Sequence, residues 1–274
     1  MDRRLTLACI QHSAGADLDA NLKETTARVR EAAGRGARLV GLPEYFSQLH
    51  LHRGRLQLTA YDEADHPALP VFRALASELG IWILLGSLPV SAPDGRAFNR
   101  SLLLDDAGRI AARYDKIHLF DVDLGRGEAY RESGVIMPGS RAVVAETPWG
   151  RLGLSVCYDL RFPHLYRRLA QAGAEILAVP SAFTRTTGQA HWHVLLRARA
   201  IENGAYVFAP AQCGTHGDGA TYGHALIVDP WGRVLADAGD TPGLILAEID
   251  LDEVARVRAR IPSLRHDRPF DLAS

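Results

Sequence analysis

Short apolar runs recur along the whole chain, and their spacing limits the possible folds more than any other feature of the sequence. Most of these runs are rich in Val, Ile and Leu, which is typical of buried β-strands. We expect strands at 5–11, 38–42, 81–88, 101–104, 142–145, 152–156, 176–179, 206–211, 225–229 and 244–249. Apolar residues at helical spacing lie between several of them, around 22–33, 71–79, 165–172 and 194–201. This alternation predicts an α/β fold.

The connections between strands predict how the sheets are built. Residues 105–108, 148–150 and 230–232 carry turn sequences between extended runs, as in hairpins, whereas helices separate other strands. Strands of both kinds indicate mixed sheets. About ten strands exceed what one twisted sheet comfortably holds, so we expect two mixed sheets packed face to face with helices outside. The prediction is one domain, residues 1–274, with a four-layer αββα sandwich.

Charge and cysteine content exclude several classes of protein. The chain has 31 Lys and Arg against 32 Asp and Glu, so its formal net charge is −1. Nucleic acids and anionic membranes require clustered basic residues, and neither is expected as a partner. No apolar stretch reaches the roughly 18 residues that span a bilayer, and the first apolar run is too short for a secretory signal. The three cysteines are an odd and sparse number, which favours a reducing cytoplasm.

The stretch 153–159 carries the strongest chemical signal. An apolar strand leads into Cys157, and a helix signal follows within six residues. Such a strand–turn–helix elbow lifts a nucleophile out of a sheet, and a helix N-terminus favours the thiolate. The alternative is a buried structural cysteine. Cys213, at a strand end before a polar loop, is the better rival for the nucleophile, whereas Cys9 lies inside an apolar strand.

Two charged residues follow other strands. Glu44 comes directly after the apolar run 39–42, at the sheet edge where open α/β folds bind ligands. Lys116 lies among Tyr114, Ile117 and Leu119, so part of its side chain is expected to be buried. A buried lysine needs a carboxylate partner, and Glu44 is a candidate. Taken alone, each residue is better explained in the ordinary way, Glu44 as a helix-start or loop glutamate and Lys116 as an exposed lysine at a strand end.

Patterns that resemble metal sites are weaker. His191 and His193 are two positions apart, so on a helix their side chains diverge. Cys213 and His216 have zinc-like spacing but no second pair of ligands. We therefore predict no metal and no organic cofactor.

Several motifs, in order, now point to a family. They are Leu42-Pro43-Glu44, residues 114–122 (YDKIHLFDV), 156–163 (VCYDLRFP), 180–192 (PSAFTRTTGQAHW), 195–202 (LLRARAIE), 211–214 (AQCG) and 222–224 (YGH). Together they resemble the nitrilase superfamily of carbon–nitrogen hydrolases, and specifically the branch that contains deaminated glutathione amidase and omega-amidase. The likeness extends from about Leu5 to about Pro269.

The resemblance implies a fold, a set of catalytic residues and an assembly. It implies an αββα sandwich that dimerises, and a triad of Cys157, Glu44 and Lys116. It also implies a second catalytic glutamate in the long loop 117–141. Glu132 matches that position best, and Glu128 is the alternative. The implied reaction is hydrolysis of a small amide through a Cys thioester with release of ammonia.

Further residues are candidates for binding the substrate. The backbone N–H of Tyr158 would stabilise an oxyanion together with Lys116. Arg161 would bind a substrate carboxylate, or else pair with Asp159. Phe183, Thr184 and Trp192 are candidate pocket walls, with core packing as the alternative for both aromatic residues.

Two positions depart from the branch pattern and leave the substrate open. His193 stands where a glutamate is usual, and Gly219 stands where an arginine is usual. We expect ω-amides of keto acids as substrates, with deaminated glutathione first. Nitriles or N-carbamoyl amines are the alternatives within the superfamily. A different class of protein is a non-catalytic redox sensor or binding module that uses Cys157 or Cys213.

Overall fold

The computed structural model describes residues 3–125 and 127–273, and its centre is an eight-stranded mixed sheet. The strand order is β15-β14-β1-β2-β5-β6-β7, and β18 pairs with β1. β14, β1, β2 and β5 pair in parallel, whereas β6, β7, β15 and β18 pair antiparallel with their neighbours. The strands are β1 (Arg4–His12), β2 (Leu39–Gly41), β5 (Trp82–Ser91), β6 (Ala97–Leu104), β7 (Ile110–Asp115), β14 (Ala211–His216), β15 (Gly219–Tyr222) and β18 (Gly243–Asp250).

A second, six-stranded mixed sheet has the order β10-β11-β12-β13-β16-β17. Its strands are β10 (Val143–Glu146), β11 (Arg151–Leu154), β12 (Ile176–Ala178), β13 (Tyr206–Ala209), β16 (Leu226–Val228) and β17 (Val234–Asp237). Two small hairpins complete the β-structure: β3 (His50–His52) with β4 (Arg55–Gln57), and β8 (Asp121–Asp123) with β9 (Ala129–Arg131).

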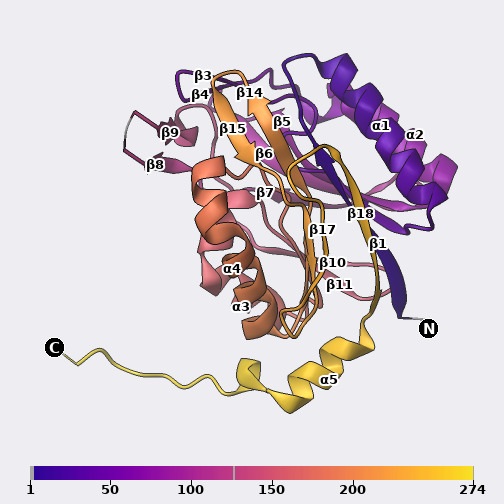
Figure 1. Ribbon diagram of the computed structural model, residues 1–274, viewed down its shortest axis with the longest axis vertical. Coiled ribbons are helices and arrows are strands. Elements are labelled where there is room, and N and C mark those ends of the chain that lie inside the picture. Colours follow the sequence, from indigo (N-terminus) through magenta and orange to yellow (C-terminus); the bar gives the residue numbers. More distant parts are fainter. Residues whose placement is uncertain (1–2, 126, 274) are drawn as a thin grey trace.

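The α-helices lie on either side of the strands (Figure 1). α1 and α2 pack together on one side, and α3 and α4 lie on the other, while α5 precedes the C-terminal segment that extends away from the body. The helices are α1 (Leu18–Gly34), α2 (Ala68–Leu79), α3 (Pro163–Gln171), α4 (Arg185–Asn203) and α5 (Asp252–Arg260). Short 3-10 turns are η1 (Glu63–Asp65), η2 (Glu132–Gly134), η3 (Cys157–Arg161) and η4 (Ser263–Arg265).

Alternation along the strands divides the interior into two cores. On β1, Leu7 and Cys9 belong to a cluster with the strands of the second sheet, whereas Ala8 and Ile10 belong to a cluster with α1 and α2. Successive strand residues point to opposite faces, so the eight-stranded sheet is covered on both sides. We call the first cluster, which also includes residues of α3 and α4, the inner core, and the second cluster, beneath α1 and α2, the outer core.

The structure confirms the predicted mixed α/β fold. The three predicted turns join β6 to β7, β10 to β11 and β16 to β17, and each pair is antiparallel. The segment 117–141 is less irregular than expected, because it contains β8, β9 and η2. The helix α5 was not predicted, because its sequence is mostly charged and only Val254 and Val257 are buried. Among the described residues, every helix is too short or too polar to span a bilayer.

A close backbone approach fixes the chain just before Glu44. Gly86 lies in β5 at a register irregularity between Leu85 and Leu88. A Cβ atom at Gly86 would lie 2.0 Å from the carbonyl oxygen of Leu42 and 2.3 Å from that of Pro43. Only a residue without a Cβ atom fits there. A glycine at position 86 is therefore required for the backbone path that leads into Glu44.

Replacement of Gly86 tests this constraint. We expect Gly86→Ala to lower the free energy of unfolding by about 1–3 kcal/mol, because the contacted atoms are backbone and must shift. Urea unfolding measures the change. Gly34→Ala, at the end of α1, is the matched control, because its added methyl group meets no atom within 4 Å. Equal midpoints for the two variants would contradict the proposed constraint.

Candidate active site

The predicted catalytic side chains follow three strands and meet in one pocket. Glu44 follows β2, Lys116 follows β7 and Cys157 follows β11. β2 and β7 run in the same direction, since β2 is parallel to β5 and two antiparallel pairings connect β5 to β7. Their carboxyl ends therefore lie at the same edge of the eight-stranded sheet. The six-stranded sheet contributes Cys157 from the opposite side of the inner core.

Lys116 is buried between two carboxylates. Its Nζ donates to Glu44 Oε1 at 2.9 Å, and to Glu132 Oε1 and Oε2 at 3.0 and 2.8 Å. Lys116 and Glu44 are each 2% exposed. Burial alone lowers the pKa of Lys116, but the charges of Glu132 and Glu44 outweigh it and hold that pKa well above its usual value. Lys116 is therefore a permanent ammonium ion at the floor of the pocket.

Both carboxylates receive further hydrogen bonds that hold them in place. Glu44 Oε2 accepts from the backbone N–H of Ala182 at 2.7 Å, and Glu132 Oε2 accepts from that of Phe120 at 2.7 Å. Ala182 follows β12 of the six-stranded sheet, so this bond joins Glu44 to the second sheet. A buried ion pair is stable only when the remaining lone pairs find donors, and these two N–H groups supply them.

Asn99 and Tyr45 also belong to this network, and sequence reasoning missed them. Asn99 Nδ2 donates to Glu44 Oε1 at 2.8 Å and to Glu132 Oε1 at 3.1 Å, so it bridges the two carboxylates. The Tyr45 hydroxyl donates to Glu132 Oε1 at 3.1 Å. A buried Asn inside a strand is uncommon, which is the one signal that could have drawn attention to Asn99.

Cys157 occupies a strained turn. Its φ is +50°, a left-handed conformation that costs a non-glycine residue about 1–3 kcal/mol. Its N–H donates to the carbonyl of Pro180 at 3.0 Å, and η3 begins at Cys157 itself. The elbow predicted from the sequence is present. The element that follows the nucleophile directly is a 3-10 turn, and the α-helix α3 begins six residues later.

Asp159 holds the elbow against the Lys116 segment. This fully buried carboxylate accepts from the N–H of Val156 at 2.9 Å, from the Tyr114 hydroxyl at 2.6 Å and from the N–H of His118 at 3.0 Å. Asp159 therefore ties the cysteine turn to residues on either side of Lys116. The expected alternative pairing of Asp159 with Arg161 is absent among these contacts.

The local charges keep the resting thiol protonated. Burial is the largest effect on Cys157, and the charge and hydrogen bond of Glu44 add to it, so the pKa is raised well above its usual value despite the opposing charge of Lys116. Two carboxylates and one ammonium give the site a net negative charge before the thiol ionises. The arrangement suits a nucleophile that loses its proton to a neighbouring base during attack.

The pocket contains some of the predicted substrate-binding residues. The pocket is partly open to solvent, and Tyr158, Phe183 and Thr184 line it. Trp192 does not line it: the side chain is fully buried behind Phe183, with ring centroids 5.0 Å apart. Arg161 also lies outside the pocket lining, with its Nη1 atom 3.2 Å from His191 Nδ1.

Position relative to the pocket also distinguishes the two candidate glutamates of the loop. Glu132 lines the pocket, whereas Glu128 does not: it accepts from the hydroxyl of Tyr130, which is a lining residue, and from that of Thr186. Gly219 packs against Leu51 of the β3–β4 hairpin, which is itself part of the pocket wall.

The other two cysteines are remote from this chemistry. Cys9 and Cys213 are both fully buried, and neither lines the pocket. Burial raises the pKa of the Cys213 thiol to about 11. Among the described residues, Cys157 is the cysteine that faces the charged network.

Comparison with known proteins now assigns the chain to a family. The family model of carbon-nitrogen hydrolases matches residues 6–259. This chain belongs to the carbon–nitrogen hydrolase family. It is thus an enzyme that hydrolyses a carbon–nitrogen bond, and the resemblance to the nitrilase superfamily is confirmed.

Individual relatives of this hydrolase cover most of its length. A protein from Synechocystis named deaminated glutathione amidase is 46% identical over 265 residues, which cover 94% of this chain and 96% of that relative. The NitFhit protein of C. elegans matches with a TM-score of 0.88 at 37% identity, over 97% of this chain and 65% of that longer chain. Saccharomyces cerevisiae Nit3, described as a member of branch 10 of the nitrilase superfamily, matches with a TM-score of 0.84 at 28% identity, over 96% of each chain.

Removal of the Glu44 charge is expected to change two properties of Cys157 in opposite directions. Glu44→Gln removes the base, so hydrolysis should fall by about 10²–10⁴-fold. It also removes a charge that raises the Cys157 pKa, so alkylation by iodoacetamide should become faster at neutral pH and its pH profile should move to lower pH. Peptide mapping identifies the alkylated cysteine.

Glu128→Gln is the matched control, because Glu128 lies in the same loop as Glu132 but outside the pocket. It should change neither hydrolysis nor alkylation. If alkylation of Glu44→Gln slows and its profile moves to higher pH, the electrostatic account of the thiol is wrong.

Proposed function

We propose that this hydrolase is an amidase that releases ammonia from short ω-amides of keto acids, with deaminated glutathione as the first candidate. One observation carries the proposal: Cys157 shares a pocket with a buried Lys116 held by Glu44 and Glu132. The Synechocystis relative bears the name of that activity. Nitriles and N-carbamoyl amines are the alternative substrates.

The network supports the following sequence of steps. Glu44 takes the proton of Cys157, and the sulfur attacks the amide carbonyl. Lys116 and the N–H of Tyr158 stabilise the oxyanion. Ammonia leaves with a proton from Glu44 and a thioester remains. Glu44 then activates water, which releases the acid and restores the thiol.

The size of the electrostatic effect supports a catalytic role for Lys116. A charge pair at 4 Å is worth about 4 kcal/mol at an effective dielectric constant of 20. This corresponds to roughly a thousandfold in rate if the interaction forms only in the transition state. Glu132 contacts Lys116 through both oxygens and lines the pocket, so we assign it the positioning of that ammonium and of the amide nitrogen or the water.

The arginine that lines the pocket, and could bind a substrate carboxylate, is not the one that the sequence analysis named. Arg131 lines the pocket beside Glu132, whereas Arg161 does not. Within the part of the chain that the structure describes, Arg131 Nη1 donates to two backbone carbonyls, those of Tyr130 at 3.0 Å and Val122 at 3.4 Å. We therefore propose Arg131 as the residue that binds a carboxylate of the substrate.

The non-catalytic alternative is less well supported. A redox-sensing thiol needs a lowered pKa. Burial raises the pKa of Cys213, Cys9 and Cys157 instead, and the pKa of Cys157 is raised further by Glu44. A glutamate and a lysine that converge on one cysteine serve acyl transfer better than reversible oxidation.

We also propose that residues 1–274 form one domain and act as a homodimer in the cytoplasm. Exposed apolar side chains on α4, Val194 at 67% and Ile201 at 51%, support self-association. The free state of all three cysteines supports a reducing compartment. The mass of the purified protein in light scattering tests the pairing.

Ammonia release from a panel of compounds tests the activity. The panel contains deaminated glutathione, α-ketoglutaramate, simple aliphatic amides, a carbamoyl amino acid and a nitrile. We expect the ω-amides of keto acids to react fastest and Cys157→Ala to release none. Faster turnover of the nitrile or the carbamoyl compound would replace the proposed substrate class, and equal release by Cys157→Ala would remove the cysteine mechanism.

Substitution of two arginines tests the carboxylate site. Arg131→Met should raise KM for a carboxylate-bearing amide by about tenfold or more, because a charge-assisted hydrogen bond contributes about 1.5–3 kcal/mol. Its KM for a neutral aliphatic amide should be unchanged. Arg161→Met is the comparison variant: its guanidinium lies over the rings of Tyr158 and Phe183, so we expect a smaller change in KM that is the same for both amides. The reverse result would return the role to Arg161.

A further inference from the structure

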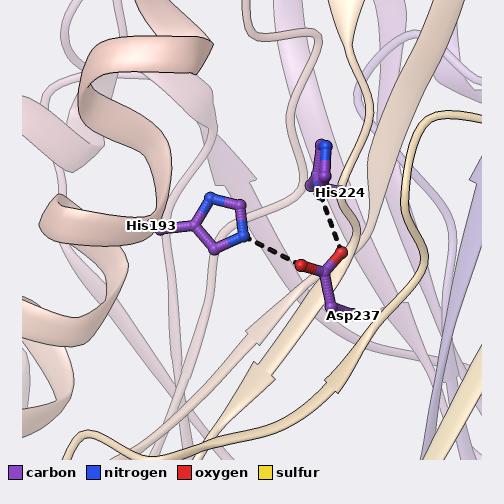
Figure 2. A group of neighbouring side chains, drawn as sticks. All are labelled: His193, His224 and Asp237. Carbon is purple, nitrogen blue, oxygen red and sulfur yellow. Dashed lines mark hydrogen bonds and ion pairs between the residues drawn. The ribbon is translucent and has the colours of Figure 1, made fainter.

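A second cluster of chemically active side chains lies outside the pocket (Figure 2). His193 on α4, His224 between β15 and β16, and Asp237 at the end of β17 point toward one another. His193 Nε2 lies 2.9 Å from Asp237 Oδ2, and His224 Nδ1 lies 2.9 Å from Asp237 Oδ1. The three ligand atoms all lie within 4.8 Å of one another. We call these residues the histidine–aspartate cluster.

The surrounding backbone holds this cluster in position. The indole N–H of Trp192 donates to the carbonyl of His224 at 2.8 Å. The N–H of His224 donates to the carbonyl of Gly239 at 2.6 Å, and the N–H of Gly239 donates to Asp237 Oδ1 at 2.9 Å. Tyr222 stacks on the His224 ring with centroids 4.4 Å apart. The cluster is therefore ordered before any ligand arrives.

His224 has an unusual backbone conformation. Its φ is +55°, one of four positive values among the described non-glycine residues, and another belongs to the nucleophile Cys157. Strained residues of this kind persist where the surroundings over-determine them, and they are frequent at functional sites.

The cluster has two imidazoles. One imidazole comes from His193 on α4 and the other from His224 in the turn before β16. His191 turns away to Arg161, as the helical spacing predicted. The partners of His193 come from distant parts of the chain, which spacing along one helix cannot reveal.

We propose that His193, His224 and Asp237 bind a divalent first-row transition metal ion, with Zn²⁺ as the best-suited ion. Two imidazoles and one carboxylate are ligands that Zn²⁺ accepts, and a fourth position stays open for water. Ligand atoms of a tetrahedral Zn²⁺ lie about 3.4 Å apart, since each bond is about 2.0–2.2 Å. Small side-chain rotations would bring the present distances to that value.

Charge and access also suit a cation. With neutral imidazoles the cluster has a charge of −1 from Asp237. The side chains of His193, His224 and Asp237 are 33%, 25% and 32% exposed, so an ion can enter from solvent without unfolding.

The position of the cluster indicates what a bound ion does. None of the three residues lines the catalytic pocket, so the ion takes no part in attack on the substrate. It joins α4 to β17 and to the turn before β16. α4 begins directly after Phe183 and Thr184, which form part of the pocket wall. A bound ion therefore stabilises the position of α4, the helix that supports this wall. We expect it to raise the thermal stability of the protein.

Zn²⁺ binding to the full-length protein tests the site. The Cys157→Ala variant is used as the parent so that the pocket thiol cannot compete for the ion. Titration against a chromophoric chelator should give one equivalent of bound Zn²⁺, and Zn²⁺ should raise the melting temperature. Co²⁺ should give the visible absorption of a low-coordinate nitrogen and oxygen site. His193→Ala should weaken binding by at least a hundredfold and abolish the shift in melting temperature.

His191→Ala is the matched control, because it removes a histidine two residues away on the same helix. It should bind one equivalent like the parent, and metal-free melting curves show whether each variant is folded. The proposal is overturned if His193→Ala and His191→Ala bind Zn²⁺ equally well, or if the parent binds none. These readouts do not use hydrolysis, so they stand whether or not the proposed substrate is correct.

Discussion

The interaction on which the active site depends is the burial of the Lys116 ammonium between Glu44 and Glu132. Removal of one partner from a buried ion pair leaves an uncompensated charge, which costs about 3–5 kcal/mol. The network is therefore stable only when complete, and its members come from both sheets and from the loop before β10. Asn99 links the two carboxylates and keeps them apart at a fixed distance. The fold positions the charges, and the charges in turn hold the ends of the strands together.

This network has an excess of negative charge, which determines how the nucleophile works. Many reactive cysteines sit beside positive charge and are ionised at rest. Here Glu44 and burial favour the neutral thiol. In the proposed mechanism, ionisation of Cys157 is then coupled to protonation of Glu44, and that proton is available for the leaving nitrogen. The same charge arrangement thus supplies the acid for the next step.

Local signals predicted much of this molecule, and tertiary contacts determined the rest. The hairpin turns, the apolar strands and the cysteine elbow could be predicted because each depends on a short run of consecutive residues. Tyr45 and Asn99 were missed because their role depends on tertiary contacts with Glu44 and Glu132. Tyrosine and asparagine also have many ordinary roles, so the residue types alone gave no signal. Arg161 is a candidate because it is near Cys157 in sequence, with pairing to Asp159 as the alternative, yet Arg131 from the loop lines the pocket. For Trp192 the sequence leaves a pocket wall and core packing open, and the structure shows core packing: Trp192 contacts the Phe183 ring and donates to the carbonyl of His224.

The origin of the catalytic groups in two different sheets has a consequence for how this sequence can change over evolutionary time. Glu44 and Lys116 extend from one sheet and Cys157 from the other, so the packing of the two sheets against each other sets the distances among these three side chains. A substitution that changes side-chain volume between the sheets therefore changes the distances in the active site as well as the stability of the fold. The outer core beneath α1 and α2 lies on the far side of the eight-stranded sheet and is free of that requirement. Two apolar interiors in one chain are thus under different selection, one for folding alone and one for folding and reaction distance.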